Sequence, residues 1–130
     1  MKSVLLTVVA FFGMAAQAHE FHTPNYCSTE IKNFCAHIGY SSQPEVNKAF
    51  EFVVDLVASP DALNQVKSAE VKLWMPEMGH GSSPVKIQRL DLKHFQVSDA
   101  FFVMEGAWLV KVDVKTASGT VQIDIPFTIK

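Results

Sequence analysis

Alternation of apolar and polar residues through most of the chain is the feature that most constrains its fold. The runs 48–56, 107–115 and 121–129 each place an apolar side chain at every second position. A period of two sends successive side chains to opposite faces of a strand, and no long helical period interrupts it. Weaker runs of the same kind cover 69–75, 85–90, 94–97 and 100–104. We therefore expect an all-β, immunoglobulin-like β-sandwich of about seven strands over residues 48–130.

The segment 19–47, in contrast, shows little periodicity and contains several turn-forming residues. We expect it to be an irregular N-terminal arm that precedes the sandwich, with one or two helical turns between Ser28 and Ala36. It carries both cysteines of the chain, Cys27 and Cys35. In an exported protein, two cysteines this close favour a disulfide. A dithiol metal site beside His37 is the alternative interpretation.

Residues 1–18 are typical of a signal peptide that is removed on export. Lys2 supplies a positive charge, an apolar run follows, and Ala16-Gln17-Ala18 forms a small-x-small cleavage site. The apolar run is shorter than the roughly 20 residues that span a bilayer. We expect a periplasmic or secreted protein that begins at His19 and has no membrane span after signal removal.

The charge balance and the motifs exclude several classes of function. The chain has 11 basic and 13 acidic residues, a net charge of −2 with neutral histidines, and no Lys/Arg run. Nucleic acid is therefore not an expected partner. The sequence has no Gly-x-Ser-x-Gly elbow, no His-Glu-x-x-His and no phosphate-binding glycine loop. We expect a protein that is not an enzyme.

The segment between the expected strands 69–75 and 85–90 contains a soft set of metal donors. Met75, Met78 and His80 lie within six residues, and one proline and two glycines in the stretch 74–81 favour a tight loop. Thioether and imidazole donors suit Cu(I), whereas magnesium and calcium prefer oxygen. Met104 comes at the end of another expected strand, and strand ends at one pole of a sandwich cluster. It is therefore a candidate fourth donor.

These residues also carry a resemblance to a known family. The run 71–80, Val-Lys-Leu-Trp-Met-Pro-Glu-Met-Gly-His, and the later run 104–112, Met-Glu-Gly-Ala-Trp-Leu-Val-Lys-Val, resemble the YtkA-like domain, a family that includes relatives of FixH. The resemblance covers about Lys48 to Ile129. It implies an immunoglobulin-like fold, an exported or membrane-anchored setting and copper handling linked to copper-oxidase assembly. The paired cysteines and the absence of a retained anchor depart from that family.

The leading hypothesis is an exported protein that binds, stores or delivers Cu(I), with a copper-donor or copper-acceptor protein as its partner. One alternative is an interaction module of the same fold, in which Met75 and Met78 make hydrophobic contacts to a protein partner. The other is a Cu(II) protein with a histidine brace, because removal of the signal would expose the amine and imidazole of His19. His22 and either His94 or His37 would complete that site.

Overall fold

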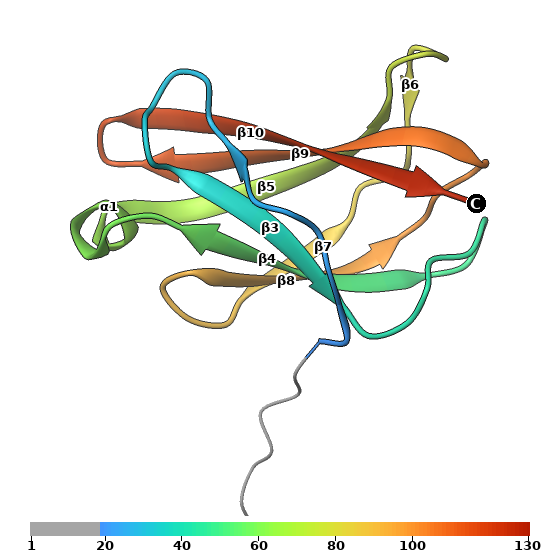
Figure 1. Cartoon of the computed structure of the whole chain (residues 1–130), viewed down its shortest axis with the longest axis horizontal. Coiled ribbons are helices and arrows are strands. Elements are labelled where there is room, and N and C mark those ends of the chain that lie inside the picture. The colour runs from blue at the N-terminus through green and yellow to red at the C-terminus, as the bar shows by residue number, and fades with distance from the viewer. Residues whose placement is uncertain (1–18) are drawn as a thin grey trace, which may run out of the picture.

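The computed structural model describes residues 19–130 as two antiparallel β-sheets packed face to face (Figure 1). The predicted signal peptide lies outside these residues. The elements in chain order are β1 (Phe21–His22), β2 (Tyr26–Cys27), β3 (Cys35–Tyr40), β4 (Phe50–Val57), α1 (Pro60–Asn64), β5 (Val66–Met75), β6 (His80–Gly81), β7 (Lys86–Arg89), β8 (His94–Ala100), β9 (Gly106–Thr116) and β10 (Gly119–Ile129).

The strand order confirms the predicted all-β, immunoglobulin-like sandwich. One sheet has the order β1-β3-β4-β8-β7, with β2 also paired to β3, and we call it sheet A. The other has the order β10-β9-β5-β6, and we call it sheet B. In Figure 1 the red and orange β10 and β9 form part of the upper layer, and the cyan-to-green β3 and β4 form part of the lower layer.

The core lies between the sheets, and the alternating residues of the predicted strands make up a large part of it. In β10 every second side chain, from Val121 to Ile129, is buried. Trp108 on β9 is only 1% exposed and lies in the core. Pro126 lacks an amide donor, and β10 is an edge strand of sheet B, as the proline predicts.

The N-terminal segment is more regular than the sequence predicted. It contributes β1, β2 and β3 to sheet A, and β3 pairs with β4 along five residue positions. The helical turns expected between Ser28 and Ala36 are absent from the structure, which has bend and turn geometry over 29–33 and then β3 from Cys35. The Ser28 hydroxyl instead accepts hydrogen bonds from the backbone amides of Glu30 and Ile31. Cys27 and Cys35 lie opposite each other on β2 and β3 and form the predicted disulfide.

The strand predicted over 100–104 is also wrong. β8 ends at Ala100, and residues 101–103 belong to no strand. Asp99 has a positive φ of 55° and lies where the pairing of β8 with β4 shifts register, one residue before the ladder ends at Ala100. The short helix α1 is capped at its N-terminus by Ser59, whose side chain accepts a hydrogen bond from the Ala62 amide. Within residues 19–130 no helix is long and apolar enough to cross a membrane.

Candidate metal centre

Met75 and His80 are held opposite each other by a tight turn. Met75 ends β5 and His80 begins β6, and the two are paired residues in the antiparallel ladder. The amide of Gly79 donates to the Met75 carbonyl oxygen at 3.0 Å, and Gly79 has a φ of 62°, which glycine adopts without strain. Directly opposite residues of an antiparallel pair project from the same face of the sheet. The turn therefore brings one thioether and one imidazole together.

The His80 ring lies on the inner side of sheet B. Met75 is only 3% exposed, so its face of β5 is the core face. The His80 ring packs edge-on to Trp108 with 6.0 Å between the ring centroids. Its Nδ1 is 3.3 Å from the Gly81 carbonyl oxygen, so the tautomer that donates from Nδ1 leaves the Nε2 lone pair free.

The segment around Met104 is anchored next to this pair. The Trp108 indole N–H donates to the Met104 carbonyl oxygen at 3.0 Å. A Cβ added to Gly106 would lie 2.6 Å from the terminal methyl carbon of Met75, so Met75 reaches the backbone two residues beyond Met104. The Ser82 hydroxyl donates to the Phe101 carbonyl and ties the end of β6 to the segment before Met104. The Met104 side chain is half-buried against the core.

Met78 stands apart from the other donors. Its side chain is 56% exposed at the tip of the turn, so it does not pack into the group formed by Met75, His80 and the Met104 segment. Its unbranched side chain has three rotatable bonds and adapts readily to a partner. We refer to Met75, Met78, His80 and Met104 as the Met/His group.

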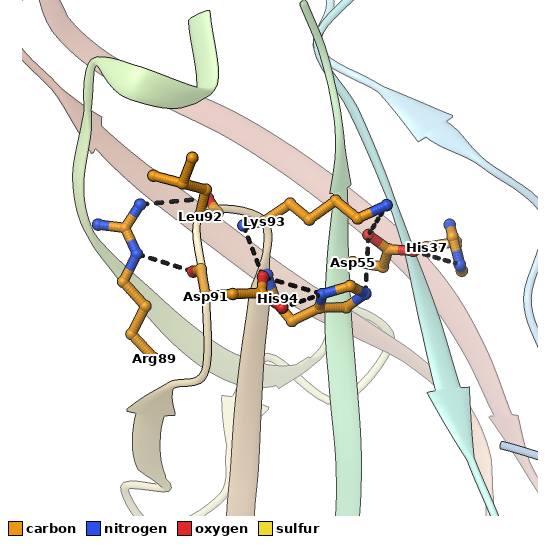
Figure 2. Close-up of polar contacts among 7 residues, drawn as sticks. All are labelled: His37, Asp55, Arg89, Asp91, Leu92, Lys93 and His94. Atoms are coloured by element: carbon orange, nitrogen blue, oxygen red, sulfur yellow. Dashed lines mark hydrogen bonds and ion pairs between the residues drawn. The ribbon is translucent and has the colours of Figure 1, made fainter. Parts of the chain in front are cut away.

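The remaining candidate histidines lie on sheet A. His37, Asp55 and His94 form a row across β3, β4 and β8, because His37 pairs with Asp55 and Asp55 pairs with His94. Their neighbours Ile38, Val54 and Phe95 are buried, so the row lies on the outer face. His37 Nε2 is 3.2 Å from one oxygen of Asp55, and His94 Nε2 is 3.5 Å from the other. Figure 2 shows the Asp55 carboxylate between the two rings.

The turn before β8 fixes the His94 ring from its other side (Figure 2). His94 Nδ1 is 2.8 Å from the Asp91 carboxylate. Desolvation by burial raises the pKa of Asp91, but hydrogen bonds from the Lys93 amide and from His94 outweigh it and hold that pKa below its ordinary value. The Arg89 guanidinium donates to the carbonyl oxygens of Asp91 and Leu92 and braces the same turn.

His19 and His22 cover the adjacent part of the same face. His22 pairs with Gly39, and atoms of both His19 and His22 lie 3.1–3.2 Å from where a Gly39 Cβ would be. The His22 ring is 5.8 Å from the His37 ring and 6.5 Å from the His19 ring, centroid to centroid. Together with Asp55 and His94 they line a pocket of about 70 Å³.

The histidine-brace hypothesis included His19, His22 and either His94 or His37, but it did not include Asp55. The alternation of β4 places Asp55 on the outer face, but only the pairing of β4 with β3 and β8 brings it between two imidazoles. In the part of the chain that the structure describes, no group of three or more His, Cys, Asp or Glu side chains stands arranged to hold a metal ion. The thioethers of the Met/His group belong to a different donor class.

Comparison with protein-family models, with curated proteins and with solved structures finds no match to this chain. The similarity to the YtkA-like domain therefore stays a prediction drawn from the two motifs.

Proposed function

We propose that the protein binds Cu(I) through Met75, His80 and Met104, with Met78 closing over the ion, and that it stores or delivers copper without catalysing a reaction. The observation that carries this proposal is the pairing of Met75 with His80 at the end of β5, beside the anchored Met104 segment. Two or three thioethers and one imidazole suit a soft monovalent ion. The residues present therefore fit copper.

The environment of the group also favours Cu(I). Met75 is buried and the His80 ring packs against Trp108, so these two donors are partly shielded from water. Thioethers are not consumed by disulfide formation, which suits the periplasmic or secreted location that we propose. Because Met78 is exposed, it would be the first ligand to contact a partner protein that supplies or receives copper, and the last ligand to separate from that partner.

A Cu(I) competition titration with a chromophoric chelator tests this function. The variants Met75→Leu, Met78→Leu, Met104→Leu and His80→Gln each remove one donor while keeping similar volume. We expect the wild-type protein to bind one equivalent, and each variant to raise the Kd by roughly tenfold or more, about 1.4 kcal/mol. His94→Gln is the matched control and should bind Cu(I) like the wild type. Failure of the wild type to compete would overturn the proposal.

The exposure of Met78 also favours the alternative of an interaction module, in which this side chain makes a hydrophobic contact to a protein partner. Met78→Leu separates the two functions, because leucine keeps the apolar surface and removes the sulfur. If Met78 serves only as a contact to a protein partner, Met78→Leu should leave metal binding unchanged. If Met78 is a copper ligand, the variant should bind Cu(I) more weakly.

A further inference from the structure

The histidine pocket on the outer face of sheet A is separate from the Met/His group, which lies at the end of sheet B. We propose that the imidazoles of His19, His22 and His37 form a second metal site, for a divalent transition-metal ion of the Cu(II) or Zn(II) class. Asp55 and His94 support this site. The proposal does not depend on the function proposed above.

Unpaired buried atoms point to a ligand in this pocket. Within residues 19–130, His19 Nδ1, His37 Nδ1 and Asp55 Oδ1 are buried and have no hydrogen-bond partner. Asp55 Oδ1 does lie within ion-pair distance of His94 Nε2 and Lys93 Nζ, at 3.5 and 3.8 Å. Leaving such groups unpaired costs free energy, and native proteins seldom do so without a reason. Two of the three atoms are imidazole nitrogens that line the same pocket. A metal ion would satisfy both.

The Asp55 carboxylate prepares His37 for this role. Histidine ligands commonly donate the N–H of their second ring nitrogen to a carboxylate, which fixes the tautomer and the ring orientation. His37 Nε2 lies 3.2 Å from Asp55 Oδ2, an ion-pair contact that favours the tautomer with its proton on Nε2 and so leaves the Nδ1 lone pair free. Asp55 is therefore a positioning residue for His37.

The sheet holds His19 and His22 over the pocket. Gly39 has no side chain, and its missing Cβ leaves the space that atoms of both histidines border at 3.1–3.2 Å. The strand β1 is fixed beside β3 because the Thr23 amide donates to the Ile38 carbonyl and the Thr23 hydroxyl accepts from the Ile38 amide, both at 2.9 Å. The histidines therefore lie on an anchored segment.

The three rings stand close enough to converge by side-chain rotation alone. The His22 centroid is 5.8 Å from that of His37 and 6.5 Å from that of His19, and rotation about χ1 and χ2 can turn the His19 and His22 rings toward His37 without moving the backbone. His22 is exposed and free to rotate. The donor nitrogens do not yet meet at one point, and rotation of the His22 side chain would bring them together around an ion.

The donor type selects the ion. Neutral imidazoles suit Zn(II) and Cu(II), and the Irving–Williams order places Cu(II) above Zn(II) at a given site. Thioethers are absent from the residues that line this pocket, so it differs from the Met/His group in its preference. One chain would thus offer a site for each oxidation state of copper.

A Cu(II) titration of the full protein tests the second site. The intact mass of the purified protein first establishes the residue at which the chain begins. Cu(II) is added alone, in competition with a chelating dye, and the bound ion is examined by electron paramagnetic resonance. The variants are His22→Gln and His37→Gln, and His80→Gln is the control outside the pocket. His22 is exposed, so its replacement leaves the fold intact.

We expect one equivalent of Cu(II) with nitrogen hyperfine structure in the wild type. His22→Gln and His37→Gln should each raise the Kd at least about tenfold and reduce that nitrogen signal, whereas His80→Gln should not. Unchanged Cu(II) binding in either pocket variant would overturn the proposal, as would a wild type that binds no Cu(II). Cu(I) binding by His22→Gln should stay normal, which keeps failure of one site distinguishable from failure of the other.

Discussion

Gly106 is the residue that gives the Met75 side chain its space. An alanine Cβ at this position would lie 2.6 Å from the Met75 methyl carbon, whereas a Cβ at Gly119 would have no atom of residues 19–130 within 4 Å. The two glycines have similar φ values, 130° and 142°. Gly119→Ala therefore isolates the backbone strain, and Gly106→Ala adds displacement of the Met75 thioether.

We expect both substitutions to lower the free energy of unfolding by about 1–3 kcal/mol through backbone strain, as measured by urea denaturation. Because a methionine end is flexible, the contact itself should add little to that loss. Only Gly106→Ala should weaken Cu(I) binding, by roughly tenfold in the chelator competition. Equal Cu(I) affinity in the two variants would argue against Met75 as a ligand.

At the scale of elements, the disulfide is the covalent link between β2 and β3. Cys27 and Cys35 are eight positions apart. Closing so short a loop stabilises the fold by about 2–3 kcal/mol in the chain-entropy model. The double variant Cys27→Ser/Cys35→Ser should lose about that much in urea denaturation. It should keep its Cu(I) affinity, because neither cysteine belongs to the Met/His group. A dithiol metal site would instead show a large loss of bound metal in this variant.

The strands that the sequence predicted best are those with large apolar residues at every second position, above all β9 and β10. β3 also alternates, with Phe34, Ala36 and Ile38 buried before and along it. The pattern was missed because alanine and Gly39 carry little apolar signal. The predicted strand 100–104 failed for the opposite reason: its residues are apolar, but the pairing of β8 with β4 shifts register around Asp99, where φ is positive, and ends at Ala100.

At the scale of the whole molecule, the two groups of candidate donors belong to different sheets. The Met/His group was predictable because three of its four members lie within six residues of the sequence. The histidine pocket was not, because His22, His37, Asp55 and His94 come from four strands far apart in the chain. Only the register of β1, β3, β4 and β8 brings them together.

X-ray absorption at the copper edge of the protein loaded with one equivalent of Cu(I) tests the central claim most directly. The thioethers and the imidazole of the Met/His group predict two or three sulfur scatterers and one nitrogen scatterer around the ion. Met78→Leu and Met104→Leu should each reduce the sulfur contribution. A coordination shell made only of nitrogen or oxygen would contradict the assignment of Cu(I) to the Met/His group.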